Sequence, residues 1–271
     1  MRNRVVPMIH VQDVKATADW YQGIGFEVNE TYGQDGEGLS FAILSFGDSE
    51  VMLNSGGQPS SARRREVDLY VYASEVDALY ARLKDRVEIV AVPHDTFYGM
   101  RELIIRDVNR FWLTFGEPSA FEVLMTGVRE GNVEAVRKAV ASGRLSPEAL
   151  TSGLAAAAEG DHKNEEIAET LRAAGANDPV KISDEILRSY VGHYRSQQGM
   201  SADISLNGHT LIATPAGQPS SNLVAIDQTT FRPAAFDGIS ITFKVENGET
   251  SGFTFRQGPM EALLTKVAGQ N

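Results

Sequence analysis

An internal repeat in the first 118 residues constrains the fold of this chain more than any other feature. The first copy opens with alternating residues at 5–11 and continues into a helix that Asp13 caps, with Val14, Ala18 and Tyr21 at helical spacing. Further strand-like stretches follow at 26–28, 39–46 and 50–53. The order of elements in this copy is therefore βαβββ.

The second copy repeats that order. A strand is predicted at 67–72, and Ser74 is predicted to cap the helix that follows. Strand-like stretches then occur at 87–92, 100–106 and 111–115. Because neither copy can bury a sheet face alone, we expect the pair to build one curved sheet with helices on its convex side.

Sequence motifs in this repeat resemble the glyoxalase/bleomycin-resistance/dioxygenase superfamily, also called the vicinal oxygen chelate (VOC) superfamily. The motifs are Pro7–Asp13, Trp20-Tyr21 and Gly25–Val28 in the first copy, and Tyr98–Glu102 and Asp107–Arg110 in the second. The resemblance covers residues 1–118 and implies a cupped sheet that holds a small molecule. It carries little information about which molecule.

The resemblance also implies four positions at which metal-using relatives place His, Glu or Gln ligands. They fall on Val6, Glu50, Val67 and Thr114, and of these only Glu50 binds a metal well. Divalent ions need several oxygen or imidazole donors that converge on one point. We therefore expect no metal and no cofactor, and not the chemistry of glyoxalase I or of extradiol dioxygenases.

Strand alternation predicts which side chains line the cup. The predicted lining is Val6, Met8, His10, Glu50, Met52, Asn54, Val67, Leu69, Met100, Glu102, Ile104, Trp112 and Thr114. Our predicted ligand-binding residues are His10, Glu50, Met52, Asn54, Met100, Glu102, Trp112 and Thr114, and we predict no catalytic residue. Alternatively, His10 is structural, Glu50 and Glu102 lie at solvent-accessible rims, and Trp112 and Met100 belong to a core or dimer interface.

The remainder of the chain divides into a helical segment, 119–180, and a strand-rich segment, 181–271. Helix-spaced apolar residues in the first resemble degenerate ankyrin helix pairs, notably at Gly131–Val136 and Leu171–Ala176. The second has about eight short strands separated by turn residues, which predicts a small antiparallel barrel or sandwich. Tyr190–Arg195 and Ile239–Phe243 resemble the β domain appended to serine β-lactamase-related proteins, without its hydrolase chemistry. The predicted class is α+β.

The composition limits the expected cellular location and binding partners. The chain has no cysteine and a net charge of −11, and it has no run of 18 apolar residues. The residues after Met1 lack the features of a secretory signal. We therefore expect a cytoplasmic protein without nucleic acid or membrane partners, in which the basic run Arg63–Arg65 is a solvated loop.

These observations favour a small-molecule-binding protein that sequesters an antibiotic-like or metabolite ligand without catalysis, as a possible homodimer. One alternative is a metal-dependent lyase, isomerase or dioxygenase of the same superfamily, with His10 and Glu50 as its anchor. Another is a regulatory or scaffold protein that only binds partners. Stoichiometric metal in the purified protein would support the first alternative, and a stable protein partner the second.

Overall fold

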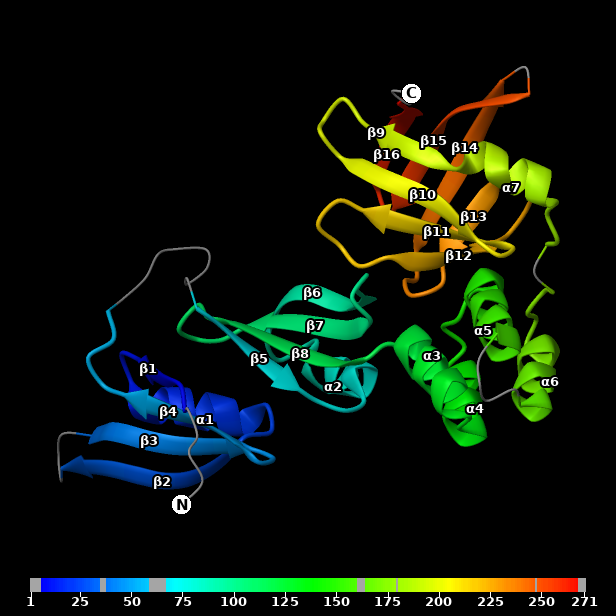
Figure 1. Ribbon diagram of the computed structural model, residues 1–271. Coiled ribbons are helices and arrows are strands. Elements are labelled where there is room, and N and C mark those ends of the chain that lie inside the picture. The colour runs from blue at the N-terminus through cyan, green and yellow to red at the C-terminus, as the bar shows by residue number, and fades with distance from the viewer. Residues whose placement is uncertain are drawn as a thin grey trace. The chain divides into compact units, whose positions relative to one another are not determined.

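A computed structural model describes residues 6–34, 38–58, 67–159, 164–178, 180–246 and 248–267 (Figure 1). The chain forms two compact units: Met1–His94 with Arg101–Glu117, and Asp95–Met100 with Pro118–Asn271. The predicted loop at Arg63–Arg65 and the first residue of the predicted strand, Val5, lie outside the described residues. The domain boundaries at 118 and 180 remain a prediction.

The first unit contains the predicted repeat. Its first copy consists of β1 (Met8–His10), α1 (Val14–Gly23), β2 (Glu27–Gln34), β3 (Gly38–Phe46) and β4 (Ser49–Asn54). Its second copy consists of β5 (Asp68–Tyr72), α2 (Val76–Leu83), β6 (Glu88–Asp95), β7 (Met100–Arg106) and β8 (Trp112–Pro118). The βαβββ pattern is thus confirmed in both copies.

The two copies build two separate four-stranded sheets, so the expectation of one continuous sheet is wrong. The strand orders are β1-β4-β3-β2 and β5-β8-β7-β6, which we call the first and second sheet. In each copy the first strand pairs in parallel with the last, β1 with β4 and β5 with β8. Each copy therefore completes a sheet of its own, and the sequence pattern of one copy contains no information about pairing with the other.

One hydrophobic core serves both copies. Alternate residues of both sheets pack into it with α1 and α2; they include Leu44, Leu53, Leu103, Ile105, Leu113 and Phe115. A buried polar network also joins the copies: the Tyr21 hydroxyl of α1 donates to Asp107 Oδ2 at 3.2 Å, just after β7. Asn109 Nδ2 donates to Thr17 Oγ1 at 2.9 Å. The face of each sheet that points away from this core is its open face.

The two helix starts differ. Asp13 is the predicted N-cap, and its side chain accepts from the Ala16 amide at 2.8 Å. The predicted cap Ser74 is wrong, because α2 begins after Glu75, which has φ 57° and makes no side-chain cap bond. The Glu75 amide donates instead to Glu117 Oε2 at 2.6 Å, so a residue from the end of β8 satisfies this helix start.

The second unit begins with four helices: α3 (Ala120–Glu130), α4 (Val133–Ala141), α5 (Pro147–Glu159) and α6 (Glu165–Ala173). All four start at a capping side chain: Ser119, Asn132, Ser146 and Asn164. Their inward faces form a core of their own, around Leu124, Val136 and Leu171. The helical prediction for this segment is confirmed, whereas its ankyrin resemblance stays a prediction.

A closed barrel of eight strands completes the second unit, in the order β10-β11-β12-β13-β14-β15-β16-β9. Helix α7 (Asp184–Tyr190) precedes it and lies at one end of it in Figure 1. Its strands are β9 (Gly192–Arg195), β10 (Ser201–Asn207), β11 (Thr210–Pro215), β12 (Ser221–Ala225), β13 (Thr230–Pro233), β14 (Ile239–Glu246), β15 (Glu249–Gln257) and β16 (Met260–Lys266). Of the two predicted forms, barrel or sandwich, the barrel is the one observed.

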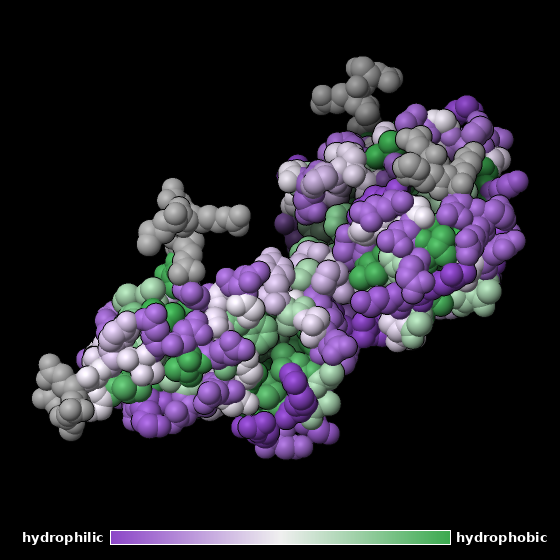
Figure 2. All heavy atoms as spheres, turned by 90° about the horizontal axis from the view of Figure 1, so that it is seen from below, coloured by the Kyte–Doolittle hydropathy of each residue, from purple (hydrophilic) through white to green (hydrophobic). Residues whose placement is uncertain are grey.

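In the described part of the chain, no helix is both long and apolar enough to cross a membrane. Apolar residues nevertheless reach the surface in patches among hydrophilic ones, as Figure 2 shows for one face. Several large apolar side chains of the first unit are exposed, including Met8, Tyr70 and Tyr72. All three belong to open faces of the two sheets.

Candidate functional site

The open face of the first sheet presents residues in rows across its strands. His10 of β1 pairs with Asn54 of β4, which pairs in turn with Phe41 of β3. The next row joins Met8, Met52 and Ile43, and Glu50 lies opposite Ser45 in the third. The structure thus brings four predicted site residues together on one face: His10, Glu50, Met52 and Asn54.

Backbone contacts fix the position of His10. Its Nδ1 lies 3.1 Å from the carbonyl oxygen of Ser55. A carbonyl oxygen only accepts, so this contact requires a proton on Nδ1, and in the neutral ring Nε2 is then an acceptor. A Cβ on Gly57 would come within 2.5 Å of the His10 carbonyl oxygen, so the backbone passes close to β1 here. His10 itself is exposed and can offer Nε2 to a ligand.

On the second sheet, the predicted register of β5 is wrong by one residue. Leu69 and Val71 pack against the shared core, so neither Leu69 nor Val67, which has the same parity, lines the open face. That face carries Asp68, Tyr70 and Tyr72 instead. The two tyrosine rings lie 5.2 Å apart between centroids, inclined by 58°, and Tyr72 is 79% exposed.

Tyr70 covers the predicted site residue Glu102. The Tyr70 hydroxyl donates to Glu102 Oε1 at 2.8 Å, and the Glu102 residue is only 4% exposed. Gly116 of β8 makes this contact possible, since a Cβ there would lie 2.1 Å from the Tyr70 hydroxyl oxygen. Glu102 is therefore no rim residue: it is a buried carboxylate beneath an exposed aromatic pair.

The other three predicted residues of this sheet lie on its open face as well. Thr114 pairs with Tyr70 and is buried, Trp112 pairs with Asp68, and Met100 begins β7. Sequence reasoning missed Tyr70, Tyr72 and Asp68. The signal that could have found them is the series Leu69, Val71 and Ala73, whose alternate spacing marks the core side of β5.

The eight predicted ligand-binding residues therefore form two sets on two sheets, four on each. The first set offers an imidazole acceptor, an amide and a carboxylate beside Met52. The second offers the Tyr70–Glu102 pair, Thr114 and aromatic surface. Together they provide apolar contact area and a few placed polar groups, the combination found in small-molecule sites.

The donor set of one chain fits a metal poorly. Among the described residues, no group of three or more His, Asp or Glu side chains is close enough to hold an ion. Of the four positions that the resemblance singles out, Val6 and Val67 carry aliphatic side chains, and Thr114 is buried beside Tyr70. With the corrected register, Asp68 replaces Val67 on the open face, which adds a carboxylate but not an imidazole.

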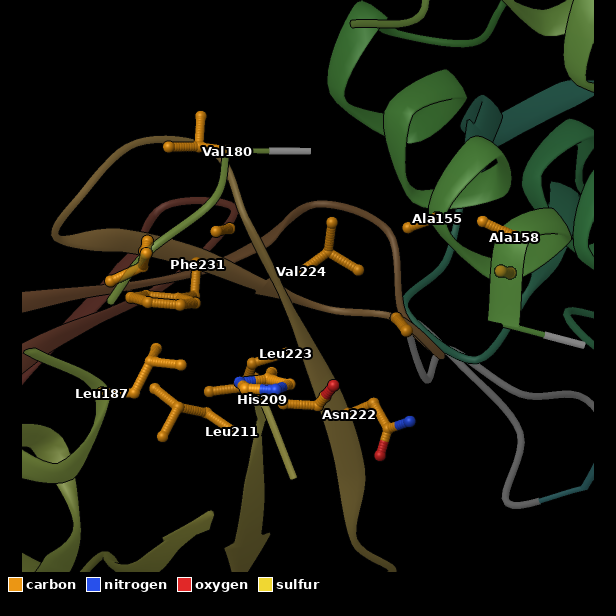
Figure 3. A pocket seen from close by; sticks show the side chains of 15 residues that line it. Ala155, Ala158, Val180, Leu187, His209, Leu211, Asn222, Leu223, Val224 and Phe231 are labelled. Atoms are coloured by element: carbon orange, nitrogen blue, oxygen red, sulfur yellow. The ribbon is translucent and has the colours of Figure 1, made fainter. Parts of the chain in front are cut away.

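The second unit has its own hollows. One of about 460 Å³ is lined by Ala155 and Ala158 of α5 and by barrel residues such as Leu211, Leu223 and Phe231 (Figure 3). Its ionisable side chain is His209, whose Nδ1 lies 2.5 Å from Asp184 Oδ1 on the surface. The three barrel residues belong to the barrel core. This hollow is therefore a gap above packed core residues and presents little chemistry.

Comparison with known proteins supports the assignment of the first unit. The sequence model of the Glyoxalase/Bleomycin resistance protein/Dioxygenase superfamily matches residues 3–115, which supports a domain of that superfamily in the N-terminal part of the chain. A search of the curated proteins gave no match. The resemblance of the C-terminal barrel to the domain of β-lactamase-related proteins therefore stays a prediction.

Three solved structures each resemble less than half of the chain. TioX from Micromonospora sp. ML1 is 23% identical, over 43% of this chain and 99% of its own, with a TM-score of 0.36. The fosfomycin resistance protein FosX from Listeria monocytogenes is 17% identical, over 45% and 98%, with a TM-score of 0.37. A bleomycin-binding protein complexed with bleomycin is 16% identical, over 44% and 100%, with a TM-score of 0.34. At these values the likenesses carry no argument about function.

Proposed function

We propose that the first unit binds an antibiotic-like or metabolite small molecule and sequesters it without converting it. The observation that carries this proposal is the Tyr70–Glu102 pair above Gly116. It couples a buried carboxyl group to an exposed aromatic pair on the open face of the second sheet. Glu102 and Tyr70 provide polar recognition, and Tyr72 provides a ring on which a planar group can stack.

The first sheet contributes the complementary contacts in this proposal. His10 accepts a hydrogen bond through Nε2, the Asn54 amide donates and accepts, and Met52 adapts to the apolar part of the ligand. Met8, Tyr70 and Tyr72 are exposed to 49%, 43% and 79%. We propose that a second copy of the chain covers these apolar side chains and completes the cup, which makes the binding protein a homodimer.

Binding is tested by thermal unfolding of the full chain against bleomycin and a panel of aromatic and peptide antibiotics. A ligand that binds only the folded state raises the melting temperature as its concentration increases. At a ligand concentration a hundred times the dissociation constant, the folded state gains about 2.7 kcal/mol of stability. We expect His10→Ala and Glu102→Gln to reduce that shift. The matched controls are His209→Ala and Glu261→Gln on the barrel surface, which should leave it unchanged.

Three outcomes would contradict the proposal. The site is wrongly placed if both site variants retain the full ligand-induced shift. Stoichiometric metal in protein purified without chelators would favour the metal-dependent enzyme instead. If light scattering shows a monomer that still binds the ligand, the proposal that a second copy of the chain completes the cup is wrong.

A further inference from the structure

The interior of the C-terminal barrel is filled at one end by aromatic rings. Tyr190 of α7 stacks on Phe243 of β14, with 4.1 Å between ring centroids and an interplanar angle of 7°. Phe231 meets both rings edge-on, and Tyr194 packs beside Phe243. The Tyr194 hydroxyl donates to the Tyr190 carbonyl at 2.6 Å, so these large residues are fixed in place.

A cavity lies beside these rings. It is apolar, has a volume of about 260 Å³ and is lined by residues of β10 to β16 and by Phe97 of the segment before β7, with Ala202, Ala213 and Ile241 in its wall. Phe253 belongs both to this wall and to the aromatic group, where its ring lies 4.8 Å from that of Tyr194. It therefore marks the boundary between the filled and the hollow parts of the barrel.

Small side chains produce this hollow. Ala202 and Ala213 are both buried members of the barrel core. They lie on the neighbouring strands β10 and β11, where Ala213 of β11 pairs with Ile204 of β10. An eight-stranded barrel is just wide enough for side chains to fill it or for one small ligand to occupy it. Protein interiors are normally close-packed, so alanines at two inward positions beside an empty volume indicate space for a ligand.

The size and the lining define the class of ligand. A cavity of about 150 Å³ in an engineered protein is known to hold benzene, so 260 Å³ accommodates about ten non-hydrogen atoms. Every side chain that lines the cavity in the described part of the chain is uncharged. The polar ones include Gln218 and Gln257, and Met200 and Met260 are partly exposed flexible side chains beside them.

We propose that the barrel of the second unit binds a neutral, mostly apolar small molecule of this size. Its ring or short chain lies against Ala202, Ala213 and Phe253, and one hydrogen-bonding group points toward Gln218 and Gln257. This site lies in a different unit from the one proposed above and does not depend on it. A charged ligand is disfavoured, because no counter-charge lines the cavity in the described residues.

The test uses the full chain and 2-naphthol, which has a two-ring apolar body and one hydroxyl group. We expect saturable binding by isothermal titration, and shifts of the Ala202 and Ala213 methyl signals in NMR spectra of the unmodified protein. The methyl group of Ala157, in the core of the helical segment, serves as the internal reference and should not move. Absence of saturable binding up to the solubility limit of 2-naphthol overturns the proposal, as does binding that leaves both methyl signals unchanged.

Variants provide the second part of the test. Ala213→Leu and, separately, Ala202→Leu fill the cavity from two strands, so each should abolish saturable binding. Ser205→Leu is the matched control, because Ser205 lies on the same strand as Ala202 but is exposed outside the barrel. A folded leucine variant that binds 2-naphthol as tightly as the unmodified chain overturns the proposal. If both leucine variants fail to fold, the methyl shifts of the unmodified chain decide the question.

Discussion

The buried hydrogen bond between Tyr21 and Asp107 predicts how strongly the two βαβββ copies depend on each other. Tyr21→Phe removes only the hydroxyl and keeps the ring, which is fully buried. Hydrogen bonds to charged groups contribute about 1.5–3 kcal/mol. Because the Tyr21–Asp107 distance of 3.2 Å is long for such a bond, and because the amides of Asn109 and Phe111 continue to donate to Asp107, we expect a loss near the lower limit, about 1.5 kcal/mol.

Tryptophan fluorescence reports this loss of stability for the first unit alone. The chain has two tryptophans, Trp20 and Trp112, and both lie in the first unit. In urea, a loss of about 1.5 kcal/mol with a slope of about 2 kcal/mol per molar moves the fluorescence midpoint by about 0.7 M. The barrel contains no tryptophan, so its unfolding does not contribute to the signal.

Tyr32→Phe is the matched control. The Tyr32 hydroxyl donates to Glu30 at 2.5 Å, a shorter contact than that of Tyr21, but both residues are exposed. Exposed pairs contribute little because water competes for both groups, so we expect the fluorescence midpoint of Tyr32→Phe to stay close to that of the unmodified chain. If Tyr32→Phe cost as much as Tyr21→Phe, burial would not be the source of the energy and our reasoning would be refuted.

Three further predictions concern single residues. Gly116→Ala should destabilise the first unit by about 1–3 kcal/mol by urea unfolding, because the new Cβ meets the Tyr70 hydroxyl; adding Tyr70→Ala should restore part of the loss. Burial raises the pKa of Asp107 above 3.8, so the folded state holds this proton more tightly; the resulting stability is full below pH 3.8 and is lost as pH rises through the raised pKa. Compared with Asp107→Asn, the unmodified chain should therefore lose stability from about pH 4 upward, and a constant difference would contradict this. Ser119→Ala removes the cap of α3, whose Oγ accepts from the Glu122 amide, and should cost about 1 kcal/mol by thermal unfolding, whereas Ser205→Ala should have little effect.

Much of the fold could be predicted because alternation and helical spacing are local signals. The two βαβββ copies, the helical segment and the strand-rich C-terminal segment all follow from such patterns. The start of α2 could not be predicted, since Ser74 is a good cap by type while the actual contact comes from Glu117, more than forty residues away. The pairing between copies is likewise a long-range property, and the structure has two sheets instead of one.

Some residues of the candidate site could be predicted from the sequence, and others could not. On β1 and β4 the polar residues His10, Glu50 and Asn54 share one parity, and the positions between them carry the aliphatic Ile9, Val51 and Leu53, so their face could be predicted. On β5 the run Val67–Tyr72 is largely apolar or aromatic, so both faces of the strand resemble a core face, and the series Leu69, Val71 and Ala73 is the signal that marks the core side. The Tyr70–Glu102 contact and the barrel cavity depend on residues far apart in sequence, for which a single chain offers no local signal.

Closure of the C-terminal barrel affects how readily this part can be combined with other domains. Edge strands of open sheets present unpaired amide and carbonyl groups that promote aggregation with other chains. In the barrel each strand has two neighbours, because β9 pairs with both β10 and β16. The sheets of the first unit instead end in β1 and β2, and in β5 and β6. When the segment that follows α6 is joined to another protein, it adds a barrel but no unpaired sheet edge. This makes the segment suited to transfer between proteins.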